Sequence, residues 1–402
     1  MKSDAIRCDN DSKLFETLLA NSDVKRVRSQ IERMEEKQAG GATRRHLLAT
    51  SVRLSRNMAP ELHKMADHCV ERLGIDTPLE LYAFSSPQFN AACFKPEDGR
   101  VYIMFSSSLL EAFAEKELLF VMGHELGHHL YKHHDIPIGY ILRGKQPPPA
   151  SLALDLFAWS RYAEVSADRA GAFCAEDMQS VARALFRLAS GVTSEKVVQF
   201  NLEEFIQQVD DMVAVDAEPG QGAPMQDWFS THPFSPLRVK ALQHFHNSEL
   251  MAKDGFNKRE LEIKVQDVMR LMEPDYLQAK TNTSKSMRRL FVAGAIAVAN
   301  AHDGISNAEK EVLKSFFSDN DLDIEKLNPE RLAEVLPKRI EDCKKLTSRA
   351  QRMQILRDLC LIARADGSVV EPELSVLKQI ATGLEVPDSF IHQCSELTDL
   401  LD

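Results

Sequence analysis

Two histidines four residues apart, His124 and His128, lie in the run HELGH within an apolar stretch, residues 117–130. This stretch predicts a helix. Positions i and i+4 of a helix lie on one face, so both imidazoles can bind one metal ion. Neutral imidazole suits zinc, which brings the pKa of a bound water toward neutral. The carboxylate of Glu125 could then take a proton from that water. The chain must therefore fold so that a third ligand from another segment reaches this face.

Two residues could supply the third ligand. His134 follows at the spacing of the pattern H-E-x-x-H-x-x-G-x-x-H, but this chain has Tyr131 where that pattern has a glycine turn. Glu164 lies on a second predicted helix, residues 151–175, which is rich in Ala and Leu. A carboxylate from a second helix is a common third zinc ligand, so we expect Glu164 to complete the site. Asp168, one turn later, could hold a ligand histidine by its other ring nitrogen. An ordinary charged helix face is the alternative.

Three further histidines, His129, His133 and His134, lie at or just after the end of the first predicted helix. We expect them to be solvated cations that the negative end of the helix dipole stabilises. On this interpretation they take no part in metal binding.

HELGH followed by a helix with the E-x-x-x-D pattern resembles the HtpX and CAAX prenyl protease type of zinc metallopeptidase, which is a gluzincin family. Two further segments are similar to segments of that family. They are Asn90-Ala91 with the run GRVYIMFSSSLLEAF that follows, and THPFSPLR at residues 231–238. The four matches occur in the family's order and cover roughly residues 75–245.

The resemblance implies a role for each matched residue. His124, His128 and Glu164 would bind one Zn²⁺ ion per chain, and Glu125 would be the general base. The residues that would line or support this site are Asp168, His232 and Arg238.

Two of these roles can be made more specific, and a substrate site can be added. His232 could donate a hydrogen bond to the oxyanion of the tetrahedral intermediate, with a structural turn at His-Pro as the alternative. Arg238 could pair with one of the two carboxylates of the second helix. An exposed strand edge beside the zinc site would let an extended peptide add as a further strand, and Asn90 and Ala91 are the candidates for that edge.

The bulk composition separates this chain from the membrane-embedded members of the family. Its longest uncharged apolar run, residues 291–299, is far shorter than the about 20 residues of a membrane span. The first residues have no apolar core, so we expect no secretory signal. The net charge of −11 disfavours nucleic acid as a partner. Seven scattered cysteines without C-x-x-C spacing indicate reduced thiols in a cytoplasmic protein.

The pattern of apolar residues predicts a mainly α (α+β) fold with four parts. Residues 1–75 would be a helical region packed on the peptidase, with helices at 14–20, 24–37 and 44–73. Residues 76–250 would be the peptidase domain, whose small sheet includes strands at 79–84 and 100–105. Residues 251–285 would be a helical linker, and residues 286–402 an all-helical domain.

The last domain contains an internal repeat. AHDGISNAEKEVLK, residues 301–314, matches ADGSVVEPELSVLK, residues 365–378, with one insertion. The pair resembles the TerB-like tellurite-resistance domain. Asp303 and Asp366 lack the acidic density of a calcium loop, so we expect them to serve turns and helix caps. We expect this domain to sense a signal or to dock a partner.

These features together predict a zinc-dependent endopeptidase that cleaves protein or peptide substrates and is regulated by its C-terminal domain. The alternative is a zinc-stabilised, non-proteolytic binding or regulatory protein that acts through the TerB-like domain.

Overall fold

The computed structural model describes residues 2–37, 41–142, 150–194, 196, 198–215, 235–269, 282–302, 304–316, 327–347, 349–365 and 369–395. These residues are 71% helical and form one small sheet, which confirms the predicted mainly α fold class. The chain divides into two compact units. One comprises Met1–Pro137, Ala158–Asp210 and His232–Met269, and the other comprises Ile138–Phe157, Asp211–Thr231 and Arg270–Asp402. The four domain boundaries expected from the sequence remain predictions.

The first unit begins with helices, as the sequence predicts, but one predicted helix is wrong. Helices α1 (Lys2–Ile6), α2 (Asp9–Ala20) and α3 (Ser22–Lys37) come first. The single helix expected over residues 44–73 is instead α4 (Ala42–Thr50), strand β1 (Val52–Leu54) and α5 (Pro60–Leu73). Pro60 occupies the first turn of α5, where a missing N–H costs nothing, and β1 gains its hydrogen bonds from a neighbouring strand.

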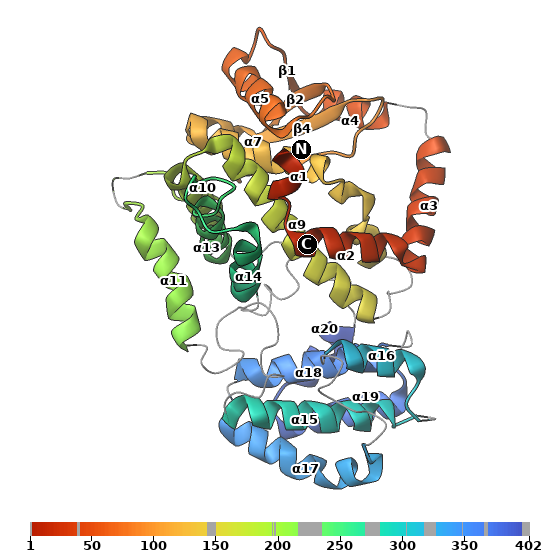
Figure 1. The fold of residues 1–402 in the computed structure, drawn as a ribbon. Coiled ribbons are helices and arrows are strands. Elements are labelled where there is room, and N and C mark those ends of the chain that lie inside the picture. The colour runs from red at the N-terminus through yellow and green to blue at the C-terminus, as the bar shows by residue number, and fades with distance from the viewer. Residues whose placement is uncertain are drawn as a thin grey trace. The chain divides into compact units, whose positions relative to one another are not determined.

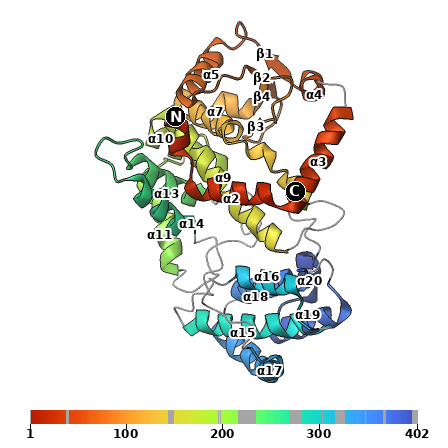
Figure 2. The same cartoon turned by 45° about the vertical axis from the view of Figure 1, so that its right-hand side comes forward.

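The sheet of the first unit has the strand order β1-β2-β4-β3. Strand β2 (Leu79–Phe84) pairs in parallel with β4 (Val101–Ser106) and antiparallel with β1, and β3 (Ala91–Cys93) pairs antiparallel with β4. The predicted strands at 79–84 and 100–105 are therefore correct to within one residue. Strand β4 is almost entirely buried, whereas β3 forms an edge of the sheet beside helix α7 (Glu115–Leu130) (Figure 2).

Helix α7 crosses α9 (Ala150–Ala175) at very close range within the first unit. Gly123 and Gly127 of α7 face Gly171 and Ala167 of α9, and a Cβ atom added to Gly123 or Gly127 would lie 2.9 Å from the backbone of α9. Only glycine lets two helix backbones approach so closely. This unit also contains α6 (Ser107–Ala112), η1 (His133–Asp135), α10 (Met178–Ser190), α13 (Ser235–His246) and α14 (Lys258–Met269). Helix α11 (Leu202–Val215) lies in it as far as Asp210 (Figure 1).

The second unit includes α8 (Ile138–Leu142) and a helical bundle around α15 (Asn282–Ala299). Thirteen residues of α15 are buried, including Leu290 and Phe291 at the centre of an apolar core. The helices around it are α16 (Asn307–Ser315), α17 (Pro329–Leu346), α18 (Arg349–Ala363), α19 (Glu371–Gly383) and α20 (Asp388–Ser395). The turn residues Asp303 and Asp366 lie outside the described residues, so their expected capping role stays a prediction.

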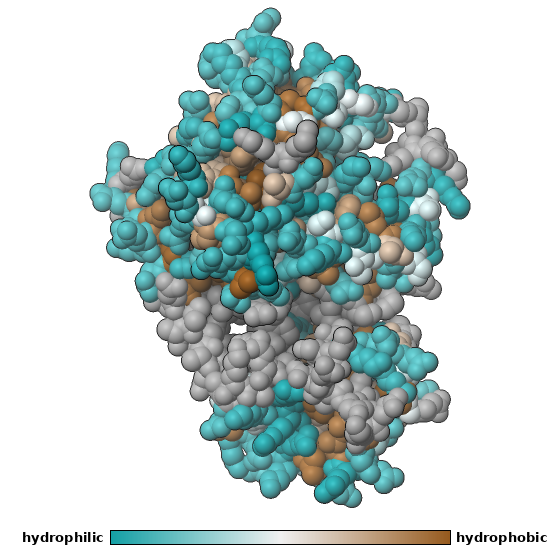
Figure 3. Space-filling view, in the orientation of Figure 1, coloured by the Kyte–Doolittle hydropathy of each residue, from teal (hydrophilic) through white to brown (hydrophobic). Residues whose placement is uncertain are grey.

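Among the described residues, we find no helix with the length and apolar content needed to span a bilayer. On the face shown in Figure 3, hydrophilic side chains predominate and hydrophobic ones gather in small patches.

Candidate metal centre

Three potential ligands converge where α7 crosses α9. The Nε2 atoms of His124 and His128 lie 3.2 Å apart. Glu164 on α9 places Oε2 3.6 Å from the first imidazole and Oε1 3.4 Å from the second. One ligand atom from each residue lies within 4.8 Å of the others, as binding of a single metal ion requires. His124 and Glu164 are buried, at 8% and 5% exposure, so an ion here would be largely shielded from solvent.

Asp168 holds the other ring nitrogen of His124. Its Oδ1 lies 2.9 Å from His124 Nδ1, which leaves Nε2 as the atom directed at the ligand cluster. Arg238 on α13 binds the same carboxylate with two hydrogen bonds, of 2.8 Å to Oδ2 and 2.6 Å to Oδ1. Although burial by itself raises the pKa of Asp168, Arg238 and His124 lower it below its ordinary value, so Asp168 stays ionised. Arg238 Nη2 also lies 3.6 Å from Glu164 Oε2.

Glu125 points toward the edge strand β3. Its Oε2 accepts a hydrogen bond of 2.7 Å from the backbone N of Cys93. The next residue, Phe94, donates its N–H to Tyr102 in the opposite direction, toward β4. Because N–H groups alternate in direction along a strand, Glu125 lies beside the outer edge of β3. Of the two predicted edge residues, Ala91 begins this strand and Asn90 immediately precedes it.

His133 is buried beside the site and holds His128, which the sequence did not reveal. Its Nδ1 lies 2.9 Å from His128 Nδ1, and its Nε2 lies 3.1 Å from Asp11 Oδ2 on α2. Burial lowers the pKa of His133 below its ordinary value, so the ring is neutral at pH 7. The chain reaches this position by leaving the helix at Tyr131 and turning at Lys132, whose φ of 59° lies in the left-handed region.

The expectation that three exposed cationic histidines follow the helix is therefore wrong. Burial lowers the pKa of His129, and it lowers the pKa of His134 to about 4. The chain does turn after the helix, although without the glycine of the longer histidine motif. That turn brings His133, not His134, to His128. Another sequence candidate, His232, lies outside the described residues.

Comparison with protein-family models shows where this site belongs. Residues 56–146 and 148–246 match Peptidase family M48, and residues 288–395 match the Tellurite resistance protein TerB family. The chain carries an M48 peptidase domain and a TerB domain. This confirms the resemblance stated from the sequence. The candidate metal centre lies within the M48 domain, except for Asp11, which precedes it.

Curated relatives of the M48 domain cover about half of this chain. The plastoglobule-localized metallopeptidase 48 of Arabidopsis thaliana is 29% identical over 219 residues, which are 50% of this chain and 61% of that protein. A protease HtpX homolog of Ralstonia nicotianae is 27% identical over 227 residues, covering 48% of this chain and 76% of its own. A protease HtpX homolog from Burkholderia cenocepacia is 27% identical over 222 residues, which are 46% of this chain and 74% of that protein. No solved structure matches the chain.

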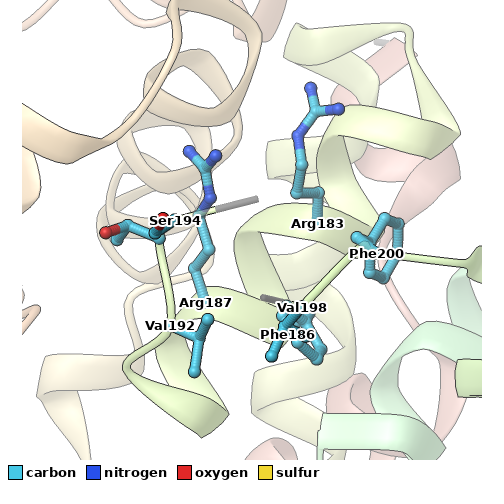
Figure 4. Close-up of a pocket in the computed structure, with 8 residues that line it drawn as sticks. Arg183, Phe186, Arg187, Val192, Ser194, Val198 and Phe200 are labelled. Atoms are coloured by element: carbon cyan, nitrogen blue, oxygen red, sulfur yellow. The ribbon is translucent and has the colours of Figure 1, made fainter. Parts of the chain in front are cut away.

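The start of α7 in the M48 domain is fixed by a buried carboxylate. Glu117 is fully buried, caps the helix by accepting from the backbone N of Ala114 at 2.7 Å, and binds Arg183 and Arg187 of α10 at 2.6 Å each. Both arginines extend in the same direction from α10 and line a small, open pocket with Phe186 and other residues (Figure 4). Because both guanidinium groups bind Glu117, these two ion pairs help to anchor α7 and hence the two histidines.

Proposed function

We propose that the protein is a zinc-dependent endopeptidase that hydrolyses peptide bonds of protein or peptide substrates. The observation that carries this proposal is the convergence of His124, His128 and Glu164 from two helices, with Glu125 next to the first histidine. Two imidazoles and one carboxylate form the ligand set of many catalytic zinc sites, which keep a fourth position for water or substrate. The donor set of this chain fits zinc in type and number.

The residues of the M48 domain would divide the chemistry as follows. When bound, zinc would polarise the scissile carbonyl and lower the pKa of the attacking water. Glu125 would take the proton of that water and pass it to the leaving amine nitrogen. Asp168 and Arg238 would keep His124 in the orientation that directs Nε2 at the metal. His232 would donate to the oxyanion, and Arg238 would also restrain Glu164.

An extended peptide is the substrate form that the edge strand supports. The Cys93 N–H faces away from β4 and toward Glu125, so the outer edge of β3 runs past the proposed general base. A substrate segment could add to this edge as a further strand, held by its backbone and therefore with little regard to sequence. Asn90 and Ala91 would form the first part of that binding edge.

The TerB domain would regulate this activity by docking a partner or sensing a signal. Its own apolar core around α15 supports an independently folded accessory domain. We also propose a cytoplasmic location, which is supported by seven buried cysteines that form no disulfide.

Metal analysis combined with a peptide-library digest tests the proposal. The wild-type chain should bind one zinc and cleave peptides, and a chelator should abolish cleavage. Glu125→Gln should keep its zinc but lose about 10²–10⁴-fold in activity, because the base and not a ligand is removed. Glu115→Gln, an exposed carboxylate on the same helix, is the matched control and should remain active. An active Glu125→Gln protein would refute the assignment of the base, and one bound zinc without cleavage would favour a non-proteolytic binding protein.

A further inference from the structure

Helix α2 places a buried carboxylate close to the metal centre. Asp11 has no exposed surface and lies within hydrogen-bond distance of four groups: Arg7 Nε at 2.8 Å, Trp159 Nε1 at 3.0 Å, Ser166 Oγ at 2.8 Å and His133 Nε2 at 3.1 Å. A buried charge is costly unless it is paired and hydrogen-bonded, so four partners fix both the ionised state and the position of this carboxylate. Figures 1 and 2 both show α2 beside α9, which carries Trp159 and Ser166.

The hydrogen bonds of Asp11 dictate where the protons of two histidines lie. An ionised carboxylate only accepts, so His133 must donate from Nε2. A neutral imidazole carries one proton, which leaves Nδ1 of His133 as an acceptor. Nδ1 of His128 must therefore donate across the 2.9 Å contact. The lone pair of His128 then lies on Nε2, the atom that faces His124 and Glu164.

We propose that Asp11 and His133 are positioning residues for His128, so that the N-terminal helix α2 sets the metal affinity of the site. This inference rests on the proposed zinc site. It assigns a role to a segment outside the M48 match, which begins at residue 56. His124 is held by Asp168 from within the M48 domain, whereas His128 depends on a carboxylate 113 residues before His124 in the chain, through His133.

We call the contacts from Asp11 through His133 to His128 the relay. Other contacts hold the N-terminal segment to the rest of the first unit. Tyr131 donates its hydroxyl proton to the backbone oxygen of Ser3 at 2.9 Å. Arg169 Nη1 donates to the backbone oxygen of Ile6 at 3.3 Å. Removal of the relay should therefore leave the segment attached. The Tyr131 contact also offers a control, because Tyr131→Phe removes only this hydroxyl and keeps the ring that packs against His133.

Zinc affinity of the full chain, measured by competition with a chromophoric chelator, tests the inference. His133→Phe keeps a ring of similar shape but offers His128 no acceptor, and Asp11→Asn removes the charge that orients His133. Each should weaken zinc binding by roughly 10–100-fold, the usual effect of losing the partner of a ligand histidine. Tyr131→Phe removes one buried hydrogen bond of the same segment and should bind zinc within about twofold of wild type, the limit we set for an unchanged affinity. Circular dichroism of each metal-free variant checks that it is folded.

A second readout uses the wild-type protein and needs no variant to fold. In the zinc-loaded chain with ring-¹⁵N-labelled histidine, NMR should find the proton of His128 on Nδ1 and that of His133 on Nε2. The reverse tautomer of His133 would overturn the inference, as would variants at Asp11 and His133 that bind zinc as tightly as wild type. A wild-type chain that binds no zinc would instead overturn the proposed function, and the positioning role with it.

Discussion

Gly171→Ala should weaken both the folded state and the metal site, because α7 and α9 leave no room for a side chain at this position. A Cβ atom at residue 171 would overlap the carbonyl oxygen of Phe120, lie 2.8 Å from Phe120 Cδ2 and lie 3.1 Å from the backbone N of His124. Comfortable carbon–carbon contacts are about 3.5–4.0 Å, so the helices would have to separate by about 0.7 Å or more. The nearest obstacle is backbone, which cannot rotate away.

The cost can be estimated from two opposing effects. Overpacking a buried site costs about 1–3 kcal/mol, and the rigid obstacle places this position near the upper end. Replacing a helical glycine by alanine returns about 0.5–1 kcal/mol. The free energy of unfolding should therefore fall by about 2 kcal/mol. Metal sites tolerate distance changes of only about 0.2 Å, so separating Glu164 from the two histidines should weaken zinc binding at least about tenfold, or about 1.4 kcal/mol.

Both quantities are measurable in one set of proteins. Urea unfolding would be followed by the fluorescence of Trp159 in a Trp228→Phe background, which leaves a single tryptophan, and zinc binding by chelator competition. Gly139→Ala in α8 is the matched control, because a Cβ there meets no atom within 4 Å. It should leave zinc affinity unchanged. If Gly171→Ala were as stable as wild type and bound zinc as tightly, the close crossing of α7 and α9 would not be what positions the ligands.

Three further predictions follow from the ion pairs and the ligand set. Glu117→Ala should lower the free energy of unfolding by about 3 kcal/mol in urea denaturation, because two arginines of α10 lose a buried partner. The folded-state pKa of Asp168 lies below its unfolded value of about 3.9, so its stabilisation is full above that pH and is lost as pH falls through the folded value. Below about pH 4, the melting temperature of Asp168→Asn should therefore fall less steeply with pH than that of wild type. Equal slopes for the variant and wild type would contradict this. At a zinc concentration 100 times the wild-type Kd, the free energy of unfolding of wild type and of Glu125→Gln should rise by about 2.7 kcal/mol. At the same zinc concentration, that of Glu164→Gln should rise much less.

The helices that carry the ligands were predictable because their signals are local. The expected bounds of 117–130 and 151–175 differ by at most two residues from those of α7 and α9. The i, i+4 spacing places both histidines on one face, and a Glu with an Asp one turn later suits a third ligand and a carboxylate that holds a ligand histidine. The structure brings His124, His128 and Glu164 together as the sequence suggested. Their metal-binding role remains to be tested.

What the sequence concealed depends on contacts between distant segments. Strand β1 lies where helical periodicity continued, because its pairing with β2 outweighs local preference in Val52–Leu54. Asp11 has the sequence context of an ordinary acidic residue in the first turn of α2, and only its burial identifies it. His133 resembled a solvated residue after a helix. The left-handed turn at Lys132 that returns it to His128 has no glycine to mark it.

The candidate metal centre therefore combines two supports of different origin. The support of His124 lies on α9, the same helix as Glu164, so one helix supplies both the third ligand and the carboxylate that orients the first. The support of His128 reaches it from α2 through His133, and α2 precedes the region that matches family M48. A fragment limited to residues 56–246 would keep all three ligands and lose Asp11. We expect that fragment to retain the ligand chemistry but to bind zinc more weakly than the full chain.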